Sequence, residues 1–459
     1  MEKSMNWNTI LSDKRTGVPS YHGIRTGYQV DFDRIIFSSA FRRLQNKTQV
    51  FPLPGSAFLH NRLTHSLEVS SVGRSLGKLV GKALIKNNLV DEANQEFYEF
   101  ELQNVIAAAC LAHDIGNPPF GHTGEKAISN YFISNKLQQI AGKPLHAYFS
   151  EQEWSDLVTF EGNANSLRVL IHQFNGKSTG GYRLTYTTLA ALIKYPCESV
   201  ASSKGKINTK KFGFFQSELD VASEILQTLN VITESTKPAV FCRHPFVYLT
   251  EAADDICYRI IDFEDAHRLH IMEHNHVADT FISLLNEINP TESAKTKTTL
   301  EGIKDKNEQV SYLRAKCINA LVDKSAEEFT RNSSSILQGK YNCGLIDTLE
   351  QRYPTLKAIA NESSEKIYNH ESVVQLELLG YKVMSDLLSL FIPAVLAHSP
   401  AHKEQKILKL LPEQFTSASA KPYDKVFSVL DYLSGMTDPY IIELYRKLFG
   451  IEIPKHTSN

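Results

Sequence analysis

The chain has 459 residues, of which 42% are hydrophobic and 22% charged, and its formal net charge is −2. This length can bury a large hydrophobic core and is sufficient for up to about three domains. A net charge near zero gives no global electrostatic case for binding nucleic acid or an anionic membrane, although a local basic pocket for phosphates stays open.

The cysteines and the apolar runs of the sequence indicate the cellular compartment of the protein. The six cysteines are scattered and form no C-x-x-C motif, which indicates a reducing environment and argues against a zinc cluster or a disulfide scaffold. The polar start, MEKSMNWNTILSDKR, does not resemble a signal peptide. The most apolar run, residues 387–397, contains Pro393 and is too short to span a bilayer. We therefore expect a cytoplasmic protein with no membrane association.

Arginines are dense in the first sixty residues. DFDRIIFSSAFRRLQNKTQVF carries Arg34, Arg42 and Arg43 on an amphipathic helix pattern, and Arg62 follows shortly. Any one of these arginines is more often part of a solvated helix face. Because they cluster ahead of candidate metal ligands, and because a guanidinium binds phosphate oxygens bidentately, the cluster favours a phosphate-binding role. The next helix pattern, residues 60–84, carries His65 near its start.

The most informative stretch is LAHDIGNPPFGHTGE, residues 111–125. An apolar helix pattern ends at His113 and Asp114, and glycines and prolines then break the helix. A His beside an Asp can give a divalent cation one nitrogen and one oxygen ligand. His122 and Glu125 follow at a spacing of three, which places them on one face if a new helix begins there. Each of these residues alone is more often structural, but their combination makes a functional role the favoured interpretation.

A second helix rich in acids follows about 140 residues later. YLTEAADDICYRIIDFEDAHR, residues 248–268, is largely apolar, and Asp254, Tyr258 and Asp262 recur on it at steps of four, so they share one side. An exposed acidic face is one interpretation. Acids flanked by alanine and isoleucine would, however, be costly to bury without a cation or a base.

The remaining chain is helical in pattern, with no strand-rich region, internal repeat or phosphate-binding glycine loop. The basic loop 200–216 is expected to be solvated. Residues 281–310 are polar and are expected to form a surface excursion between an N-terminal unit, residues 1–280, and a C-terminal helical region, residues 311–459. The predicted fold class is all-α.

The sequence resembles a known enzyme family. H…HD…D is the metal signature of the HD phosphohydrolases. The blocks AFRRLQNKTQVF, RLTHSLEV, HDIGNPPFGHTGE, FEGNA, EAADDICY and SGMTD, in this order between about residues 28 and 448, resemble the deoxyguanosine triphosphate triphosphohydrolase (dGTPase) family. The resemblance implies an HD-domain helical core with a helical C-terminal extension, and a homo-oligomer, with a hexamer as the family's pattern.

The resemblance also implies roles for individual residues. The metal ligands would be His65, His113, Asp114 and Asp254, holding Mn²⁺ or Mg²⁺, and the catalytic dyad would be His122 and Glu125. The implied substrate contacts are Gln49 near the sugar 3′-hydroxyl, Tyr258 under the deoxyribose, Arg62, Lys194, Tyr195 and Asp262 around the triphosphate, Tyr368 as a stacking aromatic, and Glu377 at the guanine edge. The match to the family is weak over residues 135–158, 200–216 and 395–425. The family supplies an arginine to the base pocket from the last of these segments, and no residue of this chain is assigned to that role.

The leading hypothesis is a metal-dependent dNTP triphosphohydrolase that prefers dGTP and cleaves at the α-phosphorus, releasing deoxynucleoside and inorganic triphosphate. One alternative is a broader HD nucleotidase that cuts monophosphates. Another is a DNA- or nucleotide-responsive sensor, with single-stranded DNA or a dNTP as effector, in which hydrolysis is secondary. Sequence leaves open whether His122 acts as an acid or a base, and whether Glu125 contacts the water directly.

Overall fold

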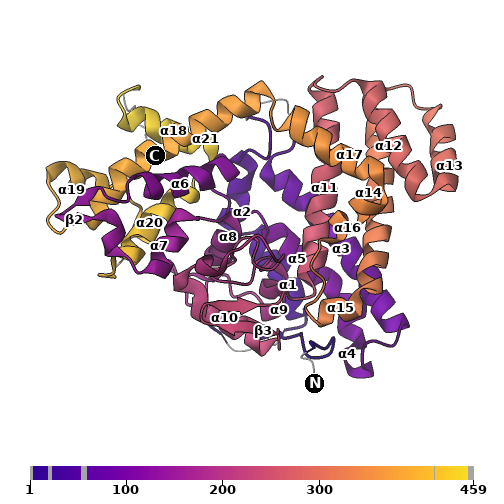
Figure 1. Ribbon diagram of the computed structural model, residues 1–459, viewed down its shortest axis with the longest axis horizontal. Helices are drawn as coiled ribbons and strands as arrows, with labels where there is room; N and C mark the ends of the chain where they lie inside the picture. Colours follow the sequence, from indigo (N-terminus) through magenta and orange to yellow (C-terminus); the bar gives the residue numbers. More distant parts are fainter. Residues whose placement is uncertain (1–3, 19–22, 53–58, 418, 453–459) are drawn as a thin grey trace.

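The computed structural model describes residues 4–18, 23–52, 59–417 and 419–452, and this part of the chain is helical apart from two short hairpins (Figure 1). The all-α expectation is confirmed. The helices up to the acid-rich one are α1 Gly27–Ile36, α2 Ser39–Arg43, α3 Arg62–Lys86, α4 Glu92–Glu96, α5 Leu102–Ala112, α6 His122–Ser134, α7 Glu151–Val158, α8 Gly162–Ile171, α9 Tyr186–Leu192, α10 Leu219–Thr228 and α11 Val247–Arg268.

The later helices are α12 His274–Ile288, α13 Pro290–Leu300, α14 Lys306–Arg331, α15 Ser333–Leu337, α16 Leu345–Arg352, α17 Pro354–Glu362, α18 Glu371–Leu396, α19 His402–Leu408, α20 Pro422–Ser434 and α21 Asp438–Leu448. The strands form two antiparallel pairs: β1 Gln139–Ile140 with β2 Lys143–Pro144, and β3 Thr233–Thr236 with β4 Ala239–Phe241. The second pair is irregular between Thr233 and Ser235.

Helices α3 and α5 pack closely against each other. Asn61 begins α3 with a capping box, in which its side chain accepts from the backbone of Thr64 while the Thr64 hydroxyl accepts from the backbone of Asn61. Gly73, Gly77 and Gly81 then repeat every four residues along α3. A Cβ at Gly77 would lie 2.8 Å from the Cα of Gln103, and one at Gly81 would collide with the carbonyl of Tyr98. The glycines therefore let the two helices approach closely.

Two hydrophobic clusters form the core. The first joins α1, α3, α5 and α9 to α11, α12, α14 and α16, and the second joins α6 and α7 to α18, α20 and α21. In Figure 1 the second cluster lies on the side of the molecule that carries α19 and β2, opposite α12 and α13. The C-terminal region predicted as residues 311–459 contributes to both clusters, because α14 to α17 pack in the first cluster and the C-terminal part of α18 in the second.

Residues 281–310, expected to form a surface excursion, are mostly helical. They include the end of α12, the whole of α13 and the first turns of α14. Phe281 and Leu285 are buried on α12, but α13 buries only the polar residues Ser293 and Thr296. A helix that packs through small polar side chains leaves little apolar periodicity in its sequence, so the polar composition of this segment did not predict α13. The division of the chain into domains remains a prediction.

Within the described residues, α18 is the one helix that is long and apolar enough to cross a membrane. Half of its most apolar window is buried inside the protein, and it packs against α6 and α20. The C-terminal part of α18 therefore packs as part of the second hydrophobic cluster.

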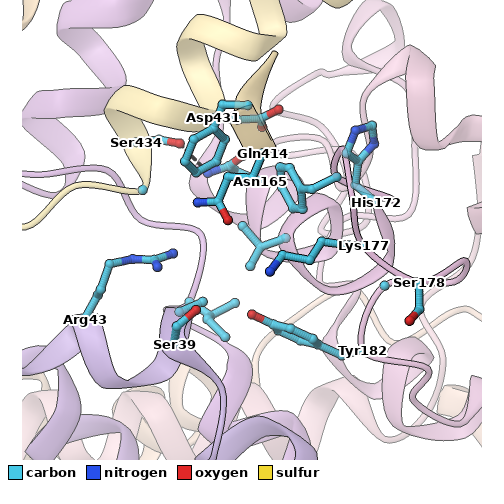
Figure 2. A pocket seen from close by; sticks show the side chains of 17 residues that line it. Ser39, Arg43, Asn165, His172, Lys177, Ser178, Tyr182, Gln414, Asp431 and Ser434 are labelled. Atoms are coloured by element: carbon cyan, nitrogen blue, oxygen red, sulfur yellow. Dashed lines mark hydrogen bonds between the residues drawn. The ribbon is translucent and has the colours of Figure 1, made fainter. Parts of the chain in front are cut away.

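A cavity of about 280 Å³ opens where the two clusters meet, between α2, α8, α20 and the loops 172–182 and 414–415 (Figure 2). We call it the seam cavity. Its walls belong to segments far apart in the sequence, so it exists only once both clusters are assembled.

Candidate metal centre and active site

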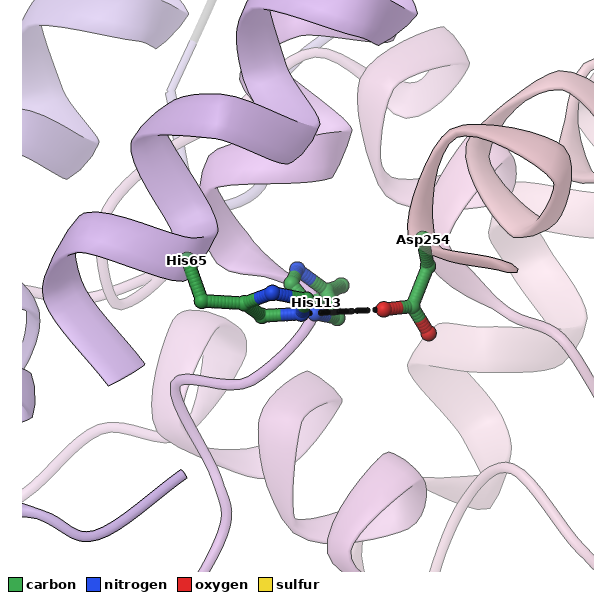
Figure 3. Close-up of side chains that lie close together, drawn as sticks. All are labelled: His65, His113 and Asp254. Carbon is green, nitrogen blue, oxygen red and sulfur yellow. Dashed lines mark hydrogen bonds and ion pairs between the residues drawn. The ribbon is translucent and has the colours of Figure 1, made fainter. Parts of the chain in front are cut away.

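Three helices bring a cluster of metal-binding side chains together (Figure 3). His65 lies in the first turn of α3, His113 caps the C-terminus of α5, and Asp254 projects from the middle of α11. The Nε2 atoms of His65 and His113 lie 3.0 and 3.5 Å from Oδ1 of Asp254. One ligand atom from each residue lies within 4.8 Å of the others. Two imidazole nitrogens and a carboxylate suit a divalent cation.

His113 is oriented as a ligand. Its Nδ1 lies 2.6 Å from the carbonyl oxygen of Cys110, and a carbonyl can only accept, so Nδ1 donates. Nε2 is then free to bind a metal, and it is buried without a hydrogen-bond partner among the described residues. Fixing one ring nitrogen to a backbone carbonyl is how proteins commonly orient a metal-binding histidine. The donor set therefore fits a resident cation.

The electrostatics of the cluster favour positive charge. Burial alone would lower the pKa of His113, but Asp114 and Asp254 outweigh burial and raise it to about 9. Burial would likewise raise the pKa of Asp254, yet His113 and His65 hold it well below its usual range. A cation bound between these groups would balance the negative charge of the carboxylates, as the protons on the imidazoles do without it.

Asp114 lies at the edge of this cluster. Its Oδ1 is 3.6 Å from Nε2 of His113 and also accepts from the Asn117 amide, while its Oδ2 accepts from Nη1 of Arg62 at 2.5 Å. Burial would raise the pKa of Asp114, but Arg62 and His113 lower it. Arg62 passes beside Gly121, where a Cβ would lie 2.5 Å from Nη2. The structure thus joins Arg62 to the predicted metal pair.

The His122–Glu125 pair begins α6. Nδ1 of His122 lies 3.3 Å from Oε2 of Glu125, as the spacing of three predicted. The imidazole is 69% exposed, whereas Glu125 is buried and its Oε1 has no partner among the described residues. Hydrogen bonding to Glu125 raises the pKa of His122. Burial would raise the pKa of Glu125, but His122 outweighs it and lowers that pKa. The pair therefore presents an oriented imidazole to solvent.

Sequence analysis missed Lys211 and Glu161 beside this pair. Lys211 belongs to the basic loop expected to be solvated, but its Nζ lies 2.8 Å from Oε2 of Glu161. Its charge also lowers the pKa values of both His122 and Glu125. Glu161 belongs to FEGNA and caps α8, which was the available signal. Nothing in the local sequence distinguishes Lys211 from its neighbouring lysines.

Lys194 and Tyr195 lie on the other side of the cluster. A cavity of about 30 Å³, enough for a water or an ion, is lined by Lys194 and Glu251 together with His113 and Asp254. Nζ of Lys194 lies 3.2 Å from Glu251 and 5.8 Å from the centre of the Tyr195 ring.

Glu251 was also missed. Arg243 donates two hydrogen bonds to it, at 2.6 and 3.2 Å. Burial would raise its pKa, but Arg243 and Lys194 lower it to about 2. Its position three residues before Asp254, on the same side of α11, was the signal that could have found it.

Tyr258, Asp262 and Tyr368 form a second group along α11. The two tyrosine rings stack with centroids 5.3 Å apart and an interplanar angle of 26°, and the Tyr368 hydroxyl donates to Oδ2 of Asp262 at 2.8 Å. Burial raises the pKa of Asp262 to about 8 despite that hydrogen bond. Because Asp254, Tyr258 and Asp262 share one side of α11, this group extends from the metal cluster along the helix.

Gln49 and Glu377 have fewer contacts. Gln49 is half-buried, and its Oε1 lacks a hydrogen-bond partner within the described chain. It directly follows Thr48, which forms a bridge with Asn61 at the start of α3. Glu377 is exposed on α18, and no hydrogen bond or ion pair of the described residues joins it to the groups above. One copy of the chain therefore does not bring Glu377 into the site.

Known proteins match this chain over nearly its whole length. The HD domain model matches residues 62–168, and the model of the phosphohydrolase-associated domain matches residues 347–447. A deoxyguanosinetriphosphate triphosphohydrolase-like protein of Synechocystis sp. is 39% identical over 98% of this chain and 100% of its own. A Pseudomonas aeruginosa protein of the same name is 37% identical over 98% and 100%. The deoxyguanosinetriphosphate triphosphohydrolase of Serratia proteamaculans is 31% identical over 93% and 94%.

The chain belongs to the deoxyguanosinetriphosphate triphosphohydrolase-like family. It is an HD-domain phosphohydrolase, and its His/Asp cluster can bind a metal. The HD match spans α3 to α8 and contains His65, the HD pair and the His122–Glu125 pair, whereas Asp254 lies outside both matched regions.

The phosphohydrolase-associated region contacts the loop that joins α5 to α6, residues 113–121, which we call the HD loop. Asp438, in the SGMTD block, accepts from the backbone of Thr48 at 2.8 Å and of Phe120 at 3.1 Å. The buried Lys47 donates to the carbonyls of Asn117, at 2.5 Å, and Ser434, at 2.8 Å. Burial lowers the pKa of Lys47 to about 7. The family's C-terminal region thus fixes the loop that carries the metal pair.

Proposed function

We propose that this phosphohydrolase is a metal-dependent dNTP triphosphohydrolase that acts preferentially on dGTP, cleaving at the α-phosphorus to give deoxyguanosine and inorganic triphosphate. The observation that carries the proposal is the His65–His113–Asp254 cluster, flanked by Arg62 and by Lys194. A cation site between an arginine and a lysine suits a polyphosphate, because phosphoryl transfer depends mainly on positioning and charge neutralisation. The name of the Serratia proteamaculans relative supports dGTP.

His65, His113 and Asp254 would hold the divalent cation, Mn²⁺ or Mg²⁺, with Asp114 as the fourth ligand. When bound, the cation supplies charge neutralisation for the phosphoryl oxygens. For Asp114 to become a ligand, its carboxylate must share its bonds to Arg62 and Asn117. Arg62 would then be partly released to bind substrate phosphate.

His122 and Glu125 would carry the proton transfers. Cleavage at the α-phosphorus requires a proton to be taken from water and another to be given to the departing oxygen. A solvent-facing imidazole held by a buried carboxylate fits either task. The raised pKa of His122 keeps more of it protonated near neutral pH, which favours donation to the leaving group.

The remaining contacts define substrate selection in this proposal. Lys194 and Tyr195, with Asp262, would surround the triphosphate, and Gln49 would bind the 3′-hydroxyl. Tyr258, held flat against Tyr368, would lie under the deoxyribose and leave no room for a 2′-hydroxyl. Glu377 would accept from the guanine edge. Because Glu377 is exposed in one copy of the chain, that contact requires a conformational change or a neighbouring subunit.

The proposal includes a cytoplasmic location and a homo-oligomer, with a hexamer as the specific expectation. Val374 and Leu378, beside Glu377 on α18, are 38% and 66% exposed, which supports burial of this face against another copy. Single-stranded DNA or a dNTP is proposed as an effector of activity.

The test is product analysis by ion-exchange chromatography after incubation with dGTP and Mn²⁺. Deoxyguanosine with intact triphosphate is expected, and Asp254→Ala should abolish both. Arg74→Gln, a change at an exposed arginine of α3 outside the N-terminal arginine cluster, is the control and should leave the products unchanged. Orthophosphate or pyrophosphate would reject the cleavage site. Equal rates with all four dNTPs would reject the dGTP preference but keep the reaction class.

A further inference from the structure

The seam cavity has the features of a second ligand site (Figure 2). Its volume is about 280 Å³, and among the described residues its lining includes none of the proposed metal ligands and neither member of the His122–Glu125 pair. It is therefore separate from the site where substrate is proposed to react.

Arg43 gives this cavity an unmatched positive charge. Its Nε is buried without a hydrogen-bond partner, and no carboxylate of the described residues pairs with the guanidinium. Figure 2 shows Arg43 and Lys177 reaching into the cavity from opposite sides. Arg43 is half-buried and Lys177 is exposed, so the guanidinium is partly removed from water while no carboxylate of the described residues balances its charge. This arrangement favours an anion between the two cations.

The acids near the cavity do not supply that counter-charge. Asp431 lines the cavity, but its two oxygens each accept a hydrogen bond from Arg168 at 2.8 Å. Glu218 accepts from the same arginine at 2.7 Å and lies 3.2 Å from Nδ1 of His172. Both carboxylates are thus held by Arg168 and not by Arg43 or Lys177. Arg168 balances one of the two negative charges, so Arg43 and Lys177 together still leave one positive charge in excess around the cavity.

The rest of the lining is apolar or aromatic. Ile115, Val169, Phe174 and Phe415 contribute apolar surface, and Tyr182 adds a ring. Pockets of this kind bind the apolar body of a ligand and fix its orientation through a few polar groups. We propose that the seam cavity binds a small organic anion, with a phosphate or carboxylate between Arg43 and Lys177 and an apolar or aromatic body against Ile115 and Phe415.

Such a ligand would contact the segment that carries the metal pair. Ile115 directly follows Asp114. Asn165, also in the lining, donates to the carbonyl of Gly116 at 2.6 Å and to the Ser434 hydroxyl at 3.3 Å. Filling the cavity would therefore stabilise the HD loop through Ile115 and Asn165, and the bound anion would be linked to metal affinity.

The experiment is calorimetric titration of the chelator-treated full chain with phenyl phosphate, which combines an anion with an aromatic body. Inorganic phosphate and benzyl alcohol each carry one half of that chemistry and should bind at least about tenfold more weakly. Benzoate in place of phenyl phosphate distinguishes a carboxylate ligand from a phosphate ligand. Absence of phenyl phosphate and benzoate binding at millimolar concentration would overturn the proposal.

Two arginine variants locate the bound probe. Arg43→Gln should weaken phenyl phosphate by about tenfold or more, since a charged hydrogen-bonding partner is lost, while Arg62→Gln, beside the metal cluster, should leave it unchanged. The reverse pattern would place the probe in the active site and reject the proposal. If Arg43→Gln does not fold, the affinity of Lys177→Gln for phenyl phosphate is measured in its place. That loop lysine is exposed, so several-fold weakening is expected, and an unchanged affinity counts against the site.

Discussion

Two buried clusters of charge in this protein differ in how completely their groups are paired. In the cluster of Arg168, Asp431 and Glu218, the side chains are 4%, 5% and 3% exposed, and the guanidinium donates to both carboxylates. In the metal cluster and its surroundings, Nε2 of His113, Nε of Arg62 and Oε1 of Glu125 are buried without partners. Buried polar groups are normally satisfied. The hydrogen bonds of the first cluster are complete in the protein alone, whereas the second cluster has buried donor and acceptor atoms left for a ligand.

The largest effect is expected when the complete cluster is broken. Arg168→Leu leaves two buried carboxylates without their arginine, which should lower the free energy of unfolding by about 3–5 kcal/mol. Urea denaturation measures this loss. Arg42→Leu, at an exposed arginine, is the matched control and should stay within about 0.5 kcal/mol. Equal stability of the two variants would show that the Arg168 cluster is not structural.

Metal should stabilise the incomplete cluster. At a free Mn²⁺ concentration of one hundred times Kd, the folded protein should gain about 2.7 kcal/mol, and a chelator should remove that gain. The thermal midpoint with and without Mn²⁺ measures it. His113→Ala should lose most of the metal-dependent shift, whereas Arg168→Leu, if folded, should retain it. A metal-dependent shift of the same size in His113→Ala would contradict the assignment of this cluster.

Asp438→Ala tests whether the C-terminal region supports the HD loop. The backbone amides of Thr48 and Phe120 would lose their acceptor, at a cost of about 1–3 kcal/mol. Because the loop carrying Asp114 is loosened, the apparent affinity for Mn²⁺ should also fall. Denaturation and a metal titration measure the two effects separately. A stability loss with unchanged metal affinity would restrict Asp438 to a purely structural role.

The smallest effect is the pH response of the His122–Glu125 pair. The raised pKa of His122 means that its pairing stabilises the fold below the ordinary histidine pKa of about 6.5 and that this contribution is lost as pH rises through the folded-state pKa. Glu125→Gln should therefore move the limb of the pH–rate profile set by His122 to lower pH. Lys211→Met removes a positive charge and should move that limb to higher pH. If both variants moved the limb in the same direction, His122 would not be the group that sets it.

Local patterns in the sequence predicted the all-α fold and the helices that carry His65, His113 and Asp254, because short motifs at fixed helical spacing determine where such side chains point. The spacing of His122 and Glu125 likewise predicted their contact. Residues whose roles depend on distant partners could not be found this way. Lys211 meets Glu161 from a loop fifty residues away, and Lys47 meets Ser434 from the opposite end of the chain.

Composition was least informative where packing is polar. Residues 281–310 were expected to form a surface excursion. Within them, the helix α13 buries Ser293 and Thr296, which are both polar. The exposure of Glu377 had no sequence signal either, because α18 is apolar on more than the face it buries, with Leu378 66% exposed. Apolar periodicity indicates a helix, but it does not say which face meets the same chain and which meets another.

The glycines of α3 have a consequence for interpreting natural variation in this protein. His65 and His113 belong to two helices whose separation is limited by Gly77 and Gly81, where a Cβ would meet the backbone of the neighbouring segment. The distance between two proposed ligands of the cation therefore depends on a helix contact to which neither ligand contributes. A variant that replaces either glycine would be recorded as a defect in metal retention, although the changed residue has no functional group that could touch an ion.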